Sequence, residues 1–166
     1  DSMTKWYLVN EIFKNQDAQL GSSVFLYKDR GGKTFMGPVW DFDIGAGNVH
    51  YSEAKNPEGW WIRQAPLIAR LFEDPAFASQ VRSSWCSLKS SYLPTLQAHI
   101  DERAYGLAEA ADRNFARWDI LGKYVWPNTV VTGSYEGEVN CLKYWLDERV
   151  RWMDQQFTAE YGACPI

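Results

Sequence analysis

At 166 residues and a net charge of −4, the chain is long enough to bury a core, and its charge points to no nucleic-acid or membrane partner. Apolar residues make up 46% of it, with nine Trp, nine Tyr and eight Phe, which excludes a disordered chain. No apolar run approaches the roughly 20 residues that a membrane-spanning helix needs.

The first part of the chain predicts a helix followed by a β-hairpin. Ser2 or Thr4 can cap a helix that runs through Trp6, Leu8, Val9, Ile12 and Phe13 and gives way near Asn15. A polar loop over residues 15–23 follows it. Two strand-like runs, residues 24–29 and 34–40, flank Gly31-Gly32, which is typical of a hairpin turn. Residues 46–64 look irregular, and a loop of that length is often functional.

From residue 66 onward the apolar pattern is helical. A short helix over residues 66–72 precedes a second one, which Asp74 caps and Pro75 opens. We expect Ser90 or Ser91 to start a third helix, and the pattern then lapses over residues 121–132. The last helix begins near Ser134 and ends at Gly162. Apolar stripes mark the buried faces of the last two helices: Leu93, Leu96, Ile100, Leu107, Ala111 and Phe115 on one, and Val139, Leu142, Leu146, Val150, Met153 and Phe157 on the other.

These elements predict one α+β domain over residues 1–166, mainly helical with a small β-hairpin. The cysteines, at positions 86, 141 and 164, lack metal-ligand spacing, so a zinc site is not expected. Cys86 and Cys141 fall in helical patterns and are interpreted as small buried apolar residues. A disulfide would require an oxidising compartment, and the spacing alone does not establish one.

Three acidic residues, Asp17, Asp41 and Asp43, stand in two loops on either side of the predicted hairpin. Asp41 and Asp43 stand in Val39-Trp-Asp-Phe-Asp-Ile-Gly45, where the following glycines favour a loop at the end of a strand. Asp17 follows Asn15 in the polar loop, and the hairpin between them can fold it back towards Asp41 and Asp43. Converging carboxylates are how a chain builds a divalent cation site.

These motifs resemble the CotH family, the kinases of the spore-coat-protein-H type, which are atypical relatives of protein kinases. The resemblance is close over residues 6–48: it comprises residues 8–17 with Asn-x-Asp, the Tyr-Lys-Asp strand end, and Gly37-Pro-Val-Trp-Asp-Phe-Asp43 with Gly47. The helical body, residues 65–158, fits more loosely, as a protein-kinase-like C-terminal lobe would.

The resemblance implies a kinase that transfers the γ-phosphoryl group of ATP to a protein Ser or Thr with Mg²⁺. It assigns Asp17 as the catalytic aspartate and Asp41 as the metal-binding aspartate, with Asp43 and, more weakly, Asn15 completing the metal's oxygen ligands. Mg²⁺ suits so few carboxylates because phosphates and water supply the other oxygens. It also implies a spore coat or another extracytoplasmic, cell-surface location.

The resemblance also implies that part of a kinase is missing. A kinase needs a phosphate-covering loop and a cation on the nucleotide phosphates, and Gly31-Gly32 is better explained as a hairpin turn. The chain opens on Asp1-Ser2, without Met or a signal peptide, and family members are longer. We therefore expect the C-terminal portion of a kinase domain, which alone is inactive and binds ATP poorly.

Other interpretations of the same residues stay open. Asp41 and Asp43 can cap a loop or pair with Arg63 or Arg30, and Asp17 can be an ordinary turn acid. The Trp60-Trp61 pair can be a stacking platform or a lid over the core, and the histidines, at positions 50 and 99, are structural or exposed. The chain can also be an inactive binding or scaffold module of the same fold that recognises a protein or glycan, or a hydrolase with an acid/base pair.

Overall fold

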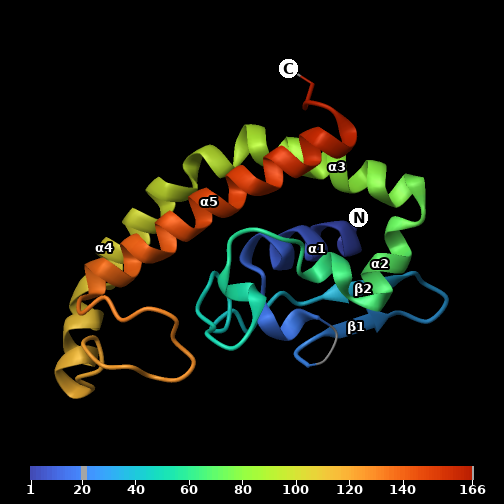
Figure 1. The fold of residues 1–166 in the computed structure, drawn as a ribbon. Helices are drawn as coiled ribbons and strands as arrows, with labels where there is room; N and C mark the ends of the chain where they lie inside the picture. The colour runs from blue at the N-terminus through green and yellow to red at the C-terminus, as the bar shows by residue number, and fades with distance from the viewer. Residues whose placement is uncertain (20–21, 166) are drawn as a thin grey trace.

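The structure is a computed structural model that describes residues 1–19 and 22–165, and it is mainly helical with one small sheet (Figure 1). In chain order its helices and strands are α1 (Ser2–Phe13), β1 (Phe25–Lys28), β2 (Thr34–Gly37), α2 (Pro66–Phe72), α3 (Pro75–Ser91), α4 (Leu96–Arg117) and α5 (Tyr135–Tyr161). Short 3₁₀ turns lie at Gln16–Ala18, Glu53–Lys55, Ile62–Gln64 and Leu93–Thr95. No described helix is both long and apolar enough to cross a membrane.

The predicted hairpin is confirmed, although its strands are shorter than expected. β1 and β2 pair antiparallel, with Phe25 opposite Gly37 and Lys28 opposite Thr34. All four residues of β1 are exposed, whereas Met36 of β2 is buried and packs into the core. The part of the predicted polar loop at residues 20 and 21 lies outside the described residues.

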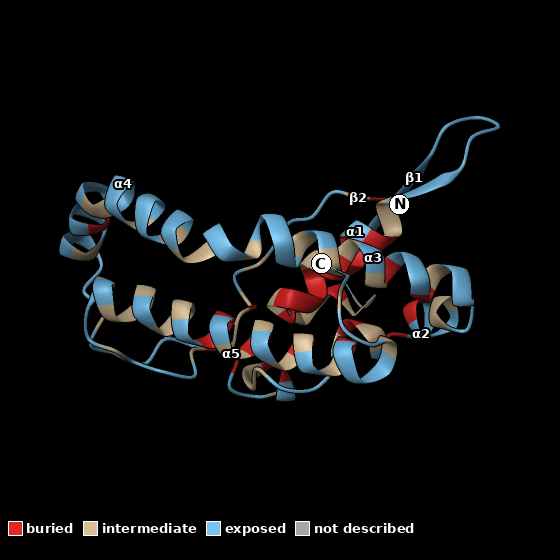
Figure 2. Cartoon of the chain, turned by 90° about the horizontal axis from the view of Figure 1, so that it is seen from above, coloured by how far each residue is buried: buried red, intermediate tan, exposed pale blue. Residues whose placement is uncertain are grey.

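The core forms where α1, α3 and the C-terminal half of α5 meet (Figure 2). Tyr7 and Leu8 of α1, Trp85 of α3, and Met153 of α5 are each at most 1% exposed. The predicted apolar stripe of α5 is confirmed at Leu146, Met153 and Phe157, which are all buried. Burial on this scale supplies the main stabilisation of the fold.

The expectations for the middle helices need correction. Asp74 caps α3 as predicted, accepting a hydrogen bond from the amide of Ala76. However, α3 runs through Ser90 and Ser91 instead of ending before them, and α4 begins only at Leu96. The predicted stripe of α4 is also wrong in part: only Ala111 is buried on this helix, and Leu107 is 56% exposed. The reason is that α4 packs mainly against α5, in an arm that extends beyond the core (Figures 1 and 2).

The interpretation of Cys86 as a buried apolar residue is wrong. Cys86 of α3 forms a disulfide with Cys164, which follows α5, with an S–S distance of 2.04 Å. The bond ties the end of the chain to α3 across 78 residues of sequence. Cys141 is a free cysteine on α5 and is partly exposed.

Candidate functional site

The first segment of the candidate site is the turn that follows α1. Asn15 is 1% exposed and caps the 3₁₀ turn Gln16–Ala18, because its side-chain oxygen accepts a hydrogen bond from the amide of Asp17 at 3.2 Å. Its amide nitrogen donates to Asn10 Oδ1 at 3.1 Å and to the carbonyl of Trp40 at 3.4 Å. Asn15 therefore fixes the backbone at Asp17, and only one lone pair of its oxygen is left for a cation.

The second segment is the loop after β2. Asp41 adopts a left-handed backbone with φ of 64°, which is uncommon for a non-glycine residue and is often seen at functional sites. Ser23 Oγ donates to Asp41 Oδ2 at 2.7 Å, and Asn48 Nδ2 donates to the carbonyl of Asp43 at 2.9 Å. Both carboxylate-bearing residues are exposed, so the loop presents its acids at the surface, as the glycines of the motif predicted.

Backbone hydrogen bonds join the two segments. The amide of Gln16 donates to the carbonyl of Ile44 at 2.9 Å, and the amide of Ala46 donates to the carbonyl of Phe13 at 2.6 Å. At Gly45 a Cβ atom would lie 3.2 Å from the Phe42 carbonyl oxygen and 3.4 Å from that of Phe13, so the close approach favours glycine. The loop after β2 is thus held directly against the turn that carries Asp17.

This contact brings the three acids close enough to influence one another. Partial burial raises the pKa of Asp17, and the charges of Asp41 and Asp43 raise it further. Within residues 1–19 and 22–165, no lysine or arginine forms an ion pair with these carboxylates. Mutual repulsion without a protein counter-charge is the electrostatic setting that a bound cation relieves.

The acids do not form a metal cage by themselves. Over the described part of the chain, no group of three or more His, Cys, Asp or Glu side chains is arranged to hold a metal ion. Mg²⁺ in phosphoryl-transfer sites is held by one or two carboxylates, and nucleotide phosphates and water supply the other oxygens. The residues present therefore fit a magnesium–nucleotide complex better than a free metal.

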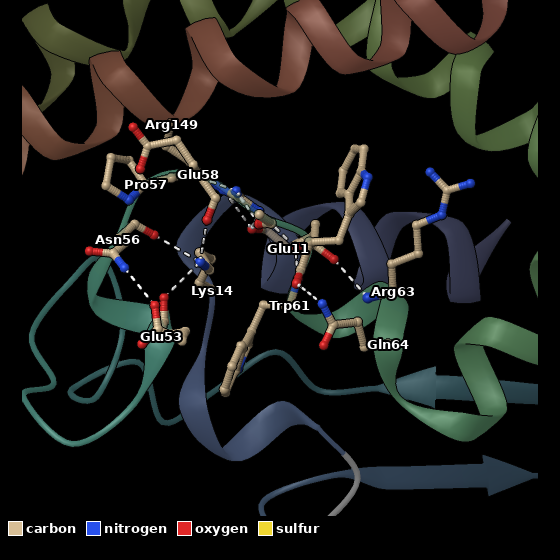
Figure 3. Close-up of polar contacts among 12 residues, drawn as sticks. Glu11, Lys14, Glu53, Asn56, Pro57, Glu58, Trp61, Arg63, Gln64 and Arg149 are labelled. Atoms are coloured by element: carbon tan, nitrogen blue, oxygen red, sulfur yellow. Dashed lines mark hydrogen bonds and ion pairs between the residues drawn. The ribbon is translucent and has the colours of Figure 1, made fainter.

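A buried polar network supports the site from behind, and Figure 3 shows its contacts. Glu11 of α1 is fully buried and accepts hydrogen bonds from the amides of Trp61 and Arg63, at 2.7 and 2.8 Å. Arg149 of α5, also fully buried, forms an ion pair with Glu11 at 2.6 Å and donates to the carbonyls of Pro57 and Gly59. Burial raises the pKa of Glu11 and lowers that of Arg149 to about 10. Because this pKa is still well above neutral pH, the guanidinium stays charged.

Lys14 joins this network to the turn that carries Asp17. It has a left-handed backbone with φ of 43°, directly before Asn15, and is 1% exposed. Its ammonium donates to the carbonyls of Glu53, Asn56 and Glu58, at 2.7–2.9 Å, so all three of its protons are used. Burial lowers the pKa of Lys14 to about 8. The loop over residues 53–58 is thereby anchored to Lys14, the residue that precedes Asn15 (Figure 3).

Comparison with known proteins supplies the family. The family described as CotH kinase protein matches residues 1–153 of the 166. The chain belongs to this family. Neither a curated protein nor a solved structure gives a significant match, so the likeness of the helical body to a kinase C-terminal lobe stays a prediction. The match to the CotH family covers both the acid-bearing segments and most of the helical body.

The structure of the chain also tests several other expectations from the sequence. Arg63 forms an ion pair with Glu160 at 2.5 Å, so its predicted pairing with Asp41 or Asp43 is wrong. Trp60 packs edge-on against Trp152 and Phe157, which makes it part of a lid over the core. His50 is exposed, and its Nδ1 lies 3.2 Å from the carbonyl of Pro127, in keeping with the structural or exposed role expected of it.

Sequence reasoning missed the three charged residues of the buried network. Glu11 and Lys14 stand next to the Asn-x-Asp motif, but a charge on an amphipathic helix is normally taken as solvated. Most partners of Lys14 and Arg149 are backbone carbonyls about 40 to 140 residues away in the sequence, and no side-chain pattern marks them. A usable signal was the charge within the apolar part of α5, where Arg149 lies one turn from Leu146 and Met153.

Proposed function

We propose that the chain carries the acid-bearing part of a CotH-type protein kinase site. The reaction moves the γ-phosphoryl group of ATP to a Ser or Thr hydroxyl of a protein acceptor. The hydroxyl oxygen bonds to the γ-phosphorus, the bond from that phosphorus to the leaving oxygen breaks, and ADP departs. Asp41 and Asp43 would hold Mg²⁺, which would supply positive charge to neutralise the phosphates.

In this proposal each acid has a separate role. Asp17 orients the acceptor hydroxyl and accepts its proton, and its raised pKa favours proton acceptance once the hydroxyl is aligned. Asp41 binds the metal, and Asp43 adds a second carboxylate. Asn15 contributes mainly by holding the Asp17 backbone through its cap, with its remaining lone pair as a weak metal ligand.

The observation that supports the proposal most strongly is the set of backbone hydrogen bonds that holds the loop with Asp41 and Asp43 against the turn with Asp17. Asp41 and Asp43 raise the pKa of Asp17 although 24 residues of sequence separate Asp17 from Asp41. The hairpin β1–β2 closes this separation, and the bonds between the turn and the loop hold it closed. If these acids served only to stabilise the fold through ion pairs, an arginine or lysine would lie among them.

We further propose that the protein works outside the reducing cytosol, at a spore coat or cell surface. The Cys86–Cys164 disulfide supports this, because disulfides persist in oxidising compartments. We also propose that residues 1–166 are one domain, the C-terminal portion of the kinase domain, with the cations that hold the phosphates supplied by another part of the protein.

Calorimetry with Mg-ATP tests these roles in the longer protein that we expect to carry the chain. Asp41→Asn should weaken Mg-ATP binding at least tenfold, because it removes a metal ligand, whereas Asp17→Asn should leave binding within about twofold. The 166-residue chain alone should bind weakly, since carboxylates without cations repel the phosphates. Tight Mg-ATP binding by the chain alone, or equal binding by wild type and Asp41→Asn, would contradict the proposal.

A further inference from the structure

A cavity of about 340 Å³ lies beside the candidate site, between the loop after β2 and the α4–α5 arm. Residues 45–48 line it together with Cys141, Leu142 and Trp145 of α5, and the charged side chains of Lys55, Lys123 and Glu138 also belong to the lining. Residues of the loop between α4 and α5, among them Val130 and Val131, line it as well. This volume is at the lower end of the roughly 300–1,000 Å³ that ligand sites enclose, so it suits one or two side chains.

The cavity lining begins next to the segments proposed for phosphoryl transfer, although the acids themselves do not line it. Its wall begins at Gly45, two residues after Asp43, which places the two Cα atoms within about 7 Å of each other. Ala46, in the same wall, donates its amide proton to the carbonyl of Phe13, just before the turn with Asn15 and Asp17. An occupant of the cavity would therefore lie only a few residues of extended chain from an acceptor hydroxyl at Asp17.

Close contacts join the segments that line the cavity. Gly47 has φ of 83°, and a Cβ atom there would lie 2.5 Å from the Trp145 ring. Trp145 Nε1 donates to the carbonyl of Lys55 at 2.8 Å, and Thr129 Oγ1 donates to the carbonyl of Gly47 at 2.8 Å. The first bond holds α5 against the turn Glu53–Lys55, and the second holds the α4–α5 loop against the segment that follows Asp43.

Exposed aromatic side chains stand in the chain next to residues that line the cavity: Tyr51 follows Asn48, and Tyr124 and Trp126 lie between Lys123 and Asn128. Tyr51 and Trp126 are stacked, with ring centroids 5.7 Å apart, and are 49% and 63% exposed. Tyr124 is 58% exposed and contacts His50, whose amide donates to the carbonyl of Pro127 at 3.0 Å. We call Tyr51, Tyr124 and Trp126 the aromatic rim. Tyr and Trp are enriched in protein interfaces, and contiguous exposed apolar surface marks such contacts.

We propose that this cavity receives a bulky apolar side chain of the protein acceptor, two to four residues from the phosphorylated Ser or Thr, while the aromatic rim packs against the same segment. The proposal rests on the proposed kinase function. It gives the acceptor a sequence preference: Leu, Ile, Met or Phe at one fixed distance from the hydroxyl. Burial of that side chain also positions the hydroxyl at Asp17. The aromatic rim favours a protein occupant over a free small molecule.

A library of serine peptides tests the preference in the longer protein with Mg-ATP. At one position of the peptide, Leu should be favoured over Ala by about tenfold in kcat/KM, because the larger side chain buries several more carbon atoms in the cavity. Val131→Trp, which fills the cavity from an exposed loop position, should reduce this ratio to below about threefold. Leu107→Trp, at an exposed position of α4, is the matched control and should leave the ratio of kcat/KM for Leu over Ala unchanged. Transfer without an apolar preference at any position, or a preference unchanged in Val131→Trp, would overturn the inference.

Cys141 provides a second measurement that needs no catalysis. It lines the cavity and is the free thiol of the chain, because Cys86 and Cys164 are bonded to each other. The preferred leucine peptide should slow alkylation of Cys141 by iodoacetamide at least threefold, and its alanine version should not. Equal protection by both peptides, or none, would refute the cavity as the binding site. Absence of transfer to any peptide, with Cys141 still protected, would instead refute the proposed kinase function and leave the peptide site supported.

Discussion

Replacing Arg149 by Met should destabilise the protein severely, because Arg149 connects three parts of the chain. Its guanidinium makes five hydrogen bonds, to the carboxylate and carbonyl of Glu11 and to the carbonyls of Pro57 and Gly59. Met retains much of the packing volume but leaves the Glu11 charge buried without its partner. Removing one member of a buried ion pair costs about 3–5 kcal/mol. With total stabilities of about 5–15 kcal/mol, that is a large share of the free energy of unfolding.

Urea unfolding followed by circular dichroism measures this loss in the 166-residue chain. We expect Arg149→Met to lower the free energy of unfolding by about 4 kcal/mol, or Tm by roughly 8–16 °C for a domain of this size. Arg151→Met is the matched control, because Arg151 lies on the same helix, is exposed and pairs only with Glu148. Arg151→Met should lower the free energy of unfolding by less than about 1 kcal/mol. Equal losses for the two variants would refute the structural role given to the network.

Three further predictions concern stability and local order. Cys86→Ser should lower the free energy of unfolding by about 2–4 kcal/mol in urea, because the disulfide closes a long loop; the same value in wild type treated with reductant and without it would contradict this. The pKa of Glu160 is lowered because Arg63 donates hydrogen bonds to its carboxylate. The contribution of this pair to the free energy of unfolding is therefore present above the ordinary glutamate pKa and is lost as pH falls through the folded-state pKa. Glu160→Gln should flatten that acid-side fall, measured by urea unfolding between pH 3 and about 6, and an unchanged slope would argue against the pair. Lys14→Met should speed amide hydrogen exchange in residues 53–59 at least tenfold, and unchanged protection there would show that the lysine does not anchor the loop.

The sequence predicted the elements whose signals are local. Asp74 with Pro75 marked the start of α3, and Gly31-Gly32 marked the hairpin turn, because capping and turn geometry depend on adjacent residues. The motif around Asp41 correctly indicated an exposed loop at the end of a strand. The hairpin also predicted that Asp17 folds back towards this loop, and the hydrogen bond from the Gln16 amide to the Ile44 carbonyl shows the two segments in contact.

What could not be predicted depends on contacts between distant segments. The disulfide partner of Cys86 lies 78 residues away, and three cysteines allow three pairings. The apolar stripe of α4 did not reveal that this helix forms an exposed arm, since periodicity identifies a face but not what covers it. The carbonyl partners of Lys14 and Arg149 are backbone groups, which carry no sequence signal. The contacts of Lys14 and Arg149 are the ones that hold the loop next to the candidate site.

Phosphate transfer by the longer protein, wild type and Asp17→Asn, tests the central claim most directly. Incorporation of labelled phosphate from Mg-ATP into a Ser or Thr peptide is measured alongside the control Asp29→Asn, an exposed acid of the hairpin. We expect wild type and Asp29→Asn to transfer phosphate at similar rates, and Asp17→Asn to be slower by a factor of about 10²–10⁴, the contribution of a positioned acid–base group. Transfer by Asp17→Asn at the wild-type rate would contradict the account.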